Sequence, residues 1–286
     1  NKKLVTMKLA LGTVQFSLYY GGTNPNRQVT IDEVRNILTL AKNNKIDTLD
    51  TASGYGNSEQ VLGKIGVNDY QIITKTIPFK NDVNKIIDGF YKSLEDLNRN
   101  QVEGVLIHNI NDIENKRFDV LFNKLNRLKN KGLIKKIGFS TYTPEHVDFL
   151  LGNFEFDLIQ LPLNVFDARL IEGGQLQALK KKGIEVHARS IFLQGVLLNF
   201  DNLPGYFLSW KKQFNEYQVM VKESGMSLLE YALNFVLNIP EIDKILVGVN
   251  SEQQLKEIVQ AVKDPKSLGA YPVDDINLLN PSFWKI

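Results

Sequence analysis

The chain has 286 residues, 43% of them hydrophobic, and its 34 basic and 32 acidic side chains leave a net charge of only +2. This balance argues against a broad nucleic-acid-binding face, and the lack of cysteine excludes disulfides, thiolate metal sites and iron–sulfur clusters. The sequence shows neither a run of about 20 apolar residues typical of a membrane span nor a signal peptide, so we expect a cytoplasmic protein, a monomer or small homo-oligomer, with no metal, nucleic-acid or membrane partner.

The first half of the chain alternates short apolar runs with amphipathic segments, which is the pattern of strands followed by helices. Thr30 is placed to N-cap the first helix, and Glu33 three residues later to complete a capping box. Gly132 is placed to end the fourth helix. The expected strand–helix pairs are residues 9–14 with 30–44, 46–51 with 58–65, 71–74 with 82–97, and 102–107 with 117–131.

The second half repeats the alternation. Pro144 suits the first position of a helix that opens at residues 143–145. The expected pairs are residues 134–139 with this helix, 156–161 with 174–182, 184–188 with helical material over 208–237, and 244–247 with 252–262. Eight such units without a domain-sized linker favour a closed parallel barrel, and no strand is followed by the G-x-G-x-x-G of a doubly wound nucleotide-binding sheet. We therefore expect an α/β fold, a single-domain (β/α)8 TIM barrel over residues 1–286, with residues 264–286 as a C-terminal tail.

Polar residues close three strands that are otherwise apolar. Asp50, Lys75 and His108 stand at the ends of the second, third and fourth expected strands, and Tyr55 lies in the loop after Asp50. Taken singly, each has a structural interpretation: a helix cap, a solvated strand end, a buried core histidine and simple loop packing. In a parallel barrel, however, these positions converge on the carboxyl end, where such folds carry their chemistry. The set therefore predicts an active site.

The run from Asp50 to Gly63, DTASGYGNSEQVLG, resembles the signature of the aldo-keto reductase family. Further family-like segments follow in order at residues 73–76, 106–108, 137–140, 193–195 and 246–252, so that the resemblance, to a bacterial branch, covers about residues 9–262. It implies an NAD(P)(H)-dependent oxidoreductase that reduces an aldehyde or ketone, or oxidises the alcohol. Tyr55 would be the general acid, Lys75 would lower the pKa of its phenol, Asp50 would pair with Lys75, and His108 would orient the carbonyl.

The resemblance also implies a cofactor site. Residues expected at the nicotinamide and its ribose are Gly12, Thr13, Ser140, Gln160 and Arg189. Residues expected at the phosphates and adenosine, where the amides of a helix N-terminus suit an anion, are Gly248, Asn250, Ser251, Gln254 and Glu257. Gln254 stands where the family usually has an Arg that clamps the 2′-phosphate, so NADP(H) is only moderately favoured over NAD(H).

The substrate pocket is expected to include Tyr19, Asn109, Arg189 and Trp284. Arg189 occupies a position where many relatives place an aromatic ring. It either pairs with a neighbouring acid on the rim or touches the cofactor and selects a substrate with a carboxylate, phosphate or several hydroxyls. The polar Asn109 favours a sugar or sugar-derived substrate. Two other readings stay open: a cofactor-binding regulatory subunit with little turnover, and a barrel isomerase or lyase that uses no nicotinamide.

Overall fold

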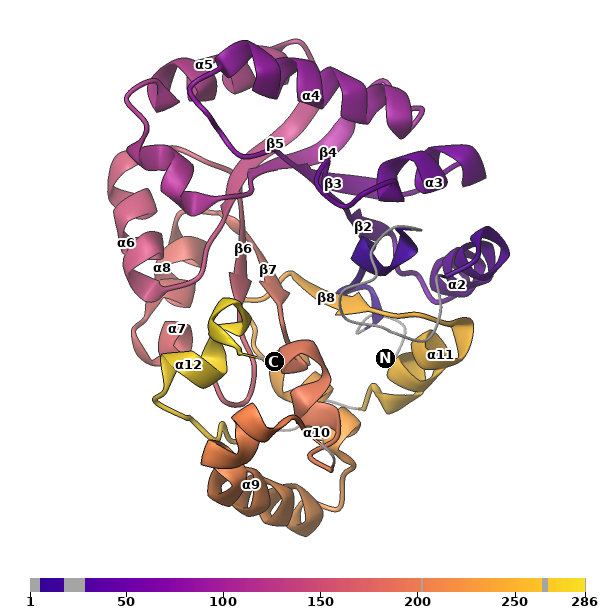
Figure 1. Cartoon of the computed structure of the whole chain (residues 1–286), viewed down its shortest axis with the longest axis vertical. Coiled ribbons are helices and arrows are strands. Elements are labelled where there is room, and N and C mark those ends of the chain that lie inside the picture. Colours follow the sequence, from indigo (N-terminus) through magenta and orange to yellow (C-terminus); the bar gives the residue numbers. More distant parts are fainter. Residues whose placement is uncertain (1–5, 18–28, 202, 264–266, 286) are drawn as a thin grey trace.

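The computed structural model describes residues 6–17, 29–201, 203–263 and 267–285. Within them, eight parallel strands form a closed barrel in chain order, which confirms the predicted fold class (Figure 1). The barrel closes where Gly12 of the first strand aligns with Asp50 on one side and Gly248 on the other. The strands are β1 (Leu9–Gly12), β2 (Thr48–Asp50), β3 (Gln71–Lys75), β4 (Val102–Ile107), β5 (Ile134–Ser140), β6 (Leu158–Pro162), β7 (Glu185–Arg189) and β8 (Lys244–Gly248).

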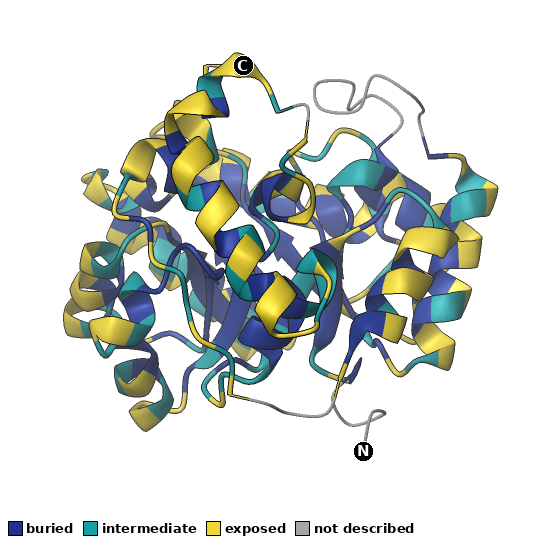
Figure 2. Ribbon diagram, turned by 90° about the horizontal axis from the view of Figure 1, so that it is seen from below, coloured by how far each residue is buried: buried dark blue, intermediate teal, exposed yellow. Residues whose placement is uncertain are grey.

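Helices surround the barrel, most of them with one face buried. Figure 2 shows the buried residues gathered on the strands and on the inward faces of the helices. The α-helices are α2 (Ile31–Asn43), α3 (Ser58–Ile65), α4 (Val83–Asp96), α5 (Phe118–Asn130), α6 (Pro144–Asn153), α7 (Arg169–Glu172), α8 (Gln175–Lys181), α9 (Lys211–Glu223), α10 (Leu228–Leu237), α11 (Glu252–Ala261) and α12 (Ile276–Leu279). Short 3-10 helices are η1 (Val14–Phe16), η2 (Ile110–Glu114), η3 (Leu193–Leu198), η4 (Gly205–Trp210) and η5 (Pro281–Phe283). Helix α10 is buried throughout residues 231–237 and contacts α9, α11 and η3. None of the described helices is long and apolar enough to cross a membrane.

The expected helix boundaries are largely confirmed, and the exceptions have local causes. The first strand ends at Gly12 rather than at residue 14, because the chain turns at Thr13 into η1. The helical material expected over residues 208–237 is η4, α9 and α10, and Gly225 (φ 72°) separates the two α-helices. The expected N-cap at Thr30 is confirmed, since its hydroxyl accepts a hydrogen bond from the backbone amide of Glu33 at 3.2 Å.

The capping box predicted for Thr30 and Glu33 is wrong in its second half. The carboxylate of Glu33 accepts the backbone amide of Glu252 at 2.6 Å, at the start of α11. A complete capping box occurs instead at α10, between Ser227 and Glu230. Glu33 is therefore committed to a neighbouring helix and does not cap its own.

The helix that follows β2 approaches its neighbour unusually closely. At Gly63, which ends the signature-like run, a Cβ atom would lie 2.0 Å from the carbonyl oxygen of Asp96. No side chain fits there, so α3 packs backbone to backbone against the end of α4. This contact fixes the position of the loop between β2 and α3, which contains Tyr55.

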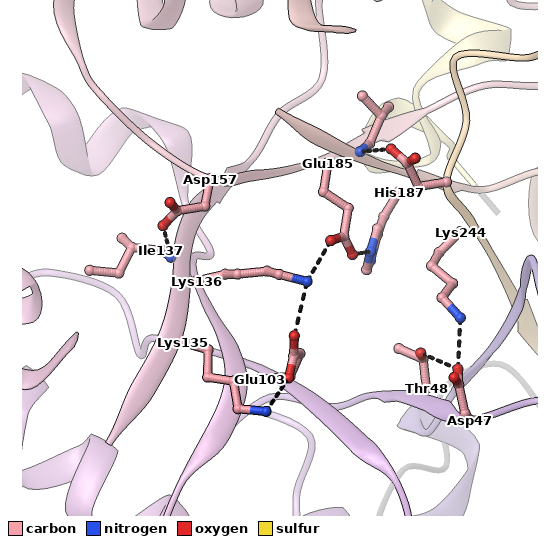
Figure 3. A network of polar contacts seen from close by, with 12 residues as sticks. Asp47, Thr48, Glu103, Lys135, Lys136, Ile137, Asp157, Glu185, His187 and Lys244 are labelled. Atoms are coloured by element: carbon pink, nitrogen blue, oxygen red, sulfur yellow. Dashed lines mark hydrogen bonds and ion pairs between the residues drawn. The ribbon is translucent and has the colours of Figure 1, made fainter. Parts of the chain in front are cut away.

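Charged residues close the amino end of the barrel (Figure 3). The ammonium of Lys136 lies 2.5 Å from Glu185 and 2.9 Å from Glu103, and Lys244 pairs with Asp47 at 2.7 Å. Burial opposes ionisation of Glu185, but hydrogen bonds from His187 and Lys136 lower its pKa to about 2. The acids and bases at this end are thus paired with one another, and the polar groups with chemistry to perform are those at the opposite, carboxyl end.

Candidate active site

The structure brings together the four side chains expected to converge. Asp50 and Lys75 end β2 and β3, His108 follows β4, and Tyr55 lies in the loop between β2 and α3. Lys75 Nζ lies 2.5 Å from Asp50 Oδ1 and 3.4 Å from the Tyr55 hydroxyl. The rings of Tyr55 and His108 meet edge to face with their centroids 6.0 Å apart. A carboxylate, an ammonium, a phenol and an imidazole therefore form one continuous group.

The innermost members of this group are almost fully buried: Asp50 is 3% exposed and Lys75 is 2% exposed. Although burial disfavours its charged form, the neighbouring Asp50 and Tyr55 raise the pKa of Lys75 above its ordinary value, so the side chain is an ammonium at neutral pH. It donates a third hydrogen bond to the carbonyl oxygen of Thr51 at 3.0 Å. Lys75 is thus a fixed positive charge aimed at the phenol.

The outer two members are uncharged. Burial raises the pKa of Tyr55, and the nearby Lys75 offsets only part of this effect. Lys75 thus acts on the Tyr55 pKa in the expected direction, but burial outweighs the cation and the pKa lies above its ordinary value. Burial, assisted by the charge of Lys75, lowers the pKa of His108 to about 4. At neutral pH Tyr55 thus carries its proton and His108 is a neutral imidazole with one N–H to donate.

Two residues expected at the cofactor also hold Asp50 in place. Gln160 Nε2 donates to the second carboxylate oxygen of Asp50 at 2.7 Å. The hydroxyl of Thr13 donates to the carbonyl oxygen of Asp50 at 3.0 Å and accepts the hydroxyl of Ser58 at 2.9 Å. Thr13 is wholly buried, and its hydroxyl is engaged in these two contacts within the protein. The role of Gln160 beside Asp50 was not foreseen from the sequence, because 110 residues separate the two.

A buried acid behind Lys75 was also missed. Glu59 is 5% exposed and accepts the hydroxyl of Thr74 at 2.6 Å. Burial raises its pKa, so it is protonated more readily than an exposed glutamate. Its place within the signature-like run, on the first turn of α3, was the available signal. When Glu59 is protonated, it adds no second negative charge beside that of Asp50.

Arg189 lies at the rim, where β7 ends. Its guanidinium donates to the carbonyl oxygen of Thr141 at 2.9 Å and lies over the ring of Tyr142, 4.4 Å from the ring centroid. None of the ion pairs among the described residues involves Arg189. The interpretation in which Arg189 merely pairs with a neighbouring acid is thus not supported there. Tyr142, two residues beyond β5, is an aromatic neighbour that the sequence analysis missed.

The residues expected at the adenosine end lie around the start of α11. The amide of Asn250 donates to Gln254 Oε1 at 2.7 Å, and the amide of Gln254 donates to the hydroxyl of Ser251 at 3.2 Å. Glu257 lies one turn further along the exposed face of the helix and accepts the side chain of Gln253. Gly248 ends β8 beside Gly12, so the expected contact residues form a path from the barrel mouth to α11.

Three substrate-pocket predictions have different outcomes. Tyr19 lies outside the described residues. Asn109 is exposed and caps η2 by accepting the amide of Asn111 at 3.2 Å, which gives it a structural task next to His108. Trp284 packs edge to face on Phe207 and donates to the carbonyl oxygen of Leu278. The tail thereby docks on the segment that follows β7, on the carboxyl side of the barrel.

A metal centre is not indicated, since no cluster of three or more potential ligands occurs in the part of the chain that the structure describes. The chemistry available at the mouth is proton donation from Tyr55, charge stabilisation by Lys75 and hydrogen bonding by His108. This set suits a reaction in which negative charge develops on a substrate oxygen.

Comparisons with known proteins bear on the fold and the family of the chain. The model of the Aldo/keto reductase family matches residues 8–276. L-galactose dehydrogenase of Arabidopsis thaliana is 29% identical over 245 residues, which is 78% of this chain and 76% of that protein. An NADH-specific methylglyoxal reductase of Escherichia coli is 27% identical over 153 residues, 48% of this chain and 47% of that protein. The structure of a glycerol dehydrogenase from Gluconobacter oxydans superposes with a TM-score of 0.70 at 22% identity, covering 91% and 87% of the two chains.

Proposed function

This chain belongs to the aldo/keto reductase family, and on that premise we propose that it interconverts a carbonyl compound and its alcohol with a nicotinamide cofactor, Tyr55 being the proton donor in the reductive direction. The observation that carries the proposal is the buried Asp50–Lys75 pair, whose ammonium reaches the hydroxyl of Tyr55 at 3.4 Å. A protonated phenol beside a fixed cation is the arrangement that a general acid needs when it must leave behind a phenolate.

When bound, the nicotinamide cofactor would supply the hydride in reduction and accept it in oxidation. The hydroxyl of Tyr55 gives its proton to the carbonyl oxygen, which becomes the hydroxyl of the product. The charge left on the Tyr55 oxygen is offset by Lys75, whose ammonium Asp50 holds in position. The neutral His108 donates its single N–H to the same substrate oxygen and orients it. Oxidation of an alcohol uses the same groups in reverse.

The donors and acceptors near the mouth fit a nicotinamide. Ser140, the last residue of β5, aligns with Gln160 in the middle of β6, and both are buried. Since Gln160 Nε2 is bound to Asp50, its carbonyl oxygen is left to accept an amide N–H of a carboxamide, and Ser140 can donate to the carboxamide oxygen. Gly12 and Gly248 border the path toward α11, and the side-chain amide of Gln15 lies against Gly248. One relative is named as NADH-specific, so either NAD(H) or NADP(H) is compatible with the family.

The charge on Arg189 indicates the substrate class. Arg189 is partly exposed beside the site, and although Asp50 acts on it through space, its guanidinium forms no ion pair with a described carboxylate. A substrate with a carboxylate, a phosphate or several hydroxyls would complete its hydrogen bonds. The names of L-galactose dehydrogenase and glycerol dehydrogenase among the relatives point to hydroxylated compounds. We therefore favour sugars or sugar-derived intermediates, with an anionic or polyhydroxylated group placed toward Arg189.

Replacing Arg189 with Gln should separate substrates by charge. We expect the kcat/KM for aldehydes that carry a carboxylate or phosphate to fall about 10- to 100-fold, because a charge-assisted hydrogen bond contributes about 1.5–3 kcal/mol. Neutral aldehydes of matched size should lose much less. The measurement is nicotinamide absorbance across such matched pairs. Equal losses for charged and neutral substrates would show that Arg189 supports the fold or the cofactor rather than the substrate.

The function itself is tested by titrating NADH and NADPH against the fluorescence of Trp210 and Trp284, followed by a panel of carbonyl compounds with cofactor oxidation as the readout. Binding of at least one cofactor and turnover of at least one carbonyl are expected. Tight binding without turnover would indicate a cofactor-binding regulatory subunit. Failure of both cofactors to bind would exclude an oxidoreductase and favour an isomerase or lyase that uses no nicotinamide.

A further inference from the structure

The amides at the start of α11 already have an anionic partner within the protein. Glu252, the first residue of the helix, donates its backbone N–H to Glu33 Oε1 at 2.6 Å. The amides of Asn250 and Gln254, each two residues from Glu252, donate to Gln254 Oε1 and to the hydroxyl of Ser251 respectively. The helix N-terminus that was expected to receive a cofactor phosphate therefore holds a carboxylate from another helix. This carboxylate offsets the positive end of the α11 dipole.

The closure of the barrel creates this contact between residues that are 219 positions apart. Since β1 pairs with both β2 and β8, α2, which precedes β2, packs beside α11, which follows the last strand. Figure 1 shows α2 and α11 as neighbours. Glu33 lies in the first turn of α2, capped by Thr30, so that its side chain reaches across to the first turn of α11. The position of the carboxylate is thus set by the fold and by a cap.

The chemistry of this corner suits a diol better than a phosphate. A ribose with free 2′ and 3′ hydroxyls offers hydrogen-bond donors, and a carboxylate such as that of Glu33 is a strong acceptor for them, as in other dinucleotide sites that accept NAD. A 2′-phosphate carries a charge of about −1.5 to −2 at neutral pH and offers only acceptors. It would face a like charge and compete with it for the amide of Glu252.

Gln254 adds to the same selectivity. An Arg at this position would present a bidentate fork to the 2′-phosphate, whereas the amide side chain of Gln254 turns its oxygen back onto the amide of Asn250. Position 254 therefore carries a neutral amide instead of a cation, and Glu33 of the adjacent α2 adds a negative charge.

We propose that Glu33 and Gln254 make this cofactor site selective for NAD(H) over NADP(H), with Glu33 as the residue that excludes the 2′-phosphate. This inference rests on the proposed function, because it assumes that a nicotinamide dinucleotide binds along the path from Gly12 to α11. It reverses the moderate preference for NADP(H) that the family resemblance suggests.

The test is a set of dissociation constants for NADH and NADPH, measured by intrinsic fluorescence and by thermal shift on the wild type, Glu33→Gln, Asp32→Asn and Glu33→Gln/Gln254→Arg. The wild type should bind NADH at least about tenfold more tightly, given the size of a like-charge interaction at short range. Glu33→Gln should reduce this discrimination by about tenfold, chiefly by strengthening NADPH binding. The double variant should prefer NADPH.

Asp32→Asn is the matched control. It removes the same charge from the adjacent position of α2, where the carboxylate pairs with Arg35 and is 82% exposed, and it should leave the ratio of the two dissociation constants unchanged. Discrimination by the wild type should also weaken as salt rises, because the Debye length falls from about 30 Å at 0.01 M to about 3 Å at 1 M. A purely structural role for Glu33 would change both affinities together and show no such dependence.

Three results would overturn the inference. If the wild type binds NADPH as tightly as NADH, or if Glu33→Gln leaves the ratio unchanged, the selectivity is not set here, and the proposed function stands. If neither cofactor binds to the wild type, the proposed function fails and this inference fails with it.

Discussion

Tyr55→Phe is expected to lower carbonyl turnover by about 10²- to 10⁴-fold, the usual contribution of a positioned general acid. The substitution removes one oxygen atom, which is the only atom of Tyr55 within hydrogen-bonding distance of Lys75. The aromatic ring and its edge-to-face contact with His108 remain. Cofactor affinity should therefore change little, and the loss should appear in the chemical step. Single-turnover measurements with saturating cofactor, together with a cofactor titration, separate the two effects.

The control for this variant is Tyr91→Phe, which deletes the same atom from a tyrosine that is 45% exposed on α4. It should retain full activity. If Tyr55→Phe keeps full activity as well, the proton comes from another group and the role assigned to Tyr55 is wrong, whatever the fold. If Tyr55→Phe loses cofactor binding in proportion to turnover, the hydroxyl contributes to binding rather than to proton transfer.

The parts of the site that the sequence predicts are those fixed by local pattern. Asp50, Lys75 and His108 each follow an apolar run, and in a parallel barrel the ends of such runs converge at one rim, so alternation alone places them together. Tyr55 lies in a loop without periodicity; its position after Asp50 places it near the same rim, and the resemblance of the run from Asp50 to Gly63 supplies its role as the general acid. The caps at Thr30 and Thr143 were predictable for the same reason as the strand ends, since each depends on residues within a few positions.

The parts that the sequence does not predict depend on distant contacts or on a balance of opposed effects. The hydrogen bond between Gln160 and Asp50 and the one between Glu33 and the amide of Glu252 join positions 110 and 219 residues apart. No local pattern encodes either. The direction of the Tyr55 pKa is the net result of burial against the charge of Lys75, and the sequence reveals the charge but not the degree of burial. The capping box at Glu33 failed because a tertiary partner competes with the local one.

We expect the buried ion pair of Asp50 and Lys75 to be required for turnover but to contribute less to stability than an apolar pair would. Lys75→Met is expected to abolish turnover and to lower the free energy of unfolding by about 3–5 kcal/mol, because it leaves a buried carboxylate without its counter-charge. Asp50 would then retain only the hydrogen bond from Gln160 among its charged or amide partners in the described residues. The free energies come from urea unfolding of the wild type and the variant.

The double variant Asp50→Asn/Lys75→Met distinguishes stability from catalysis. It removes both charges, keeps an oxygen that accepts from Gln160 Nε2, and replaces the stem of Lys75 with an apolar side chain of similar length. Neutral replacement of a buried ion pair is often harmless or stabilising, so most of the lost unfolding free energy should return while turnover stays absent. If the double variant is as unstable as Lys75→Met, the pair holds the fold together through its specific contacts. If it recovers both stability and turnover, neither charge acts on Tyr55, and the electrostatic account of the proton donor is wrong. Recovery of stability alone means that the charges are kept because the phenol of Tyr55 needs a cation beside it, although an apolar pair would fold at least as well.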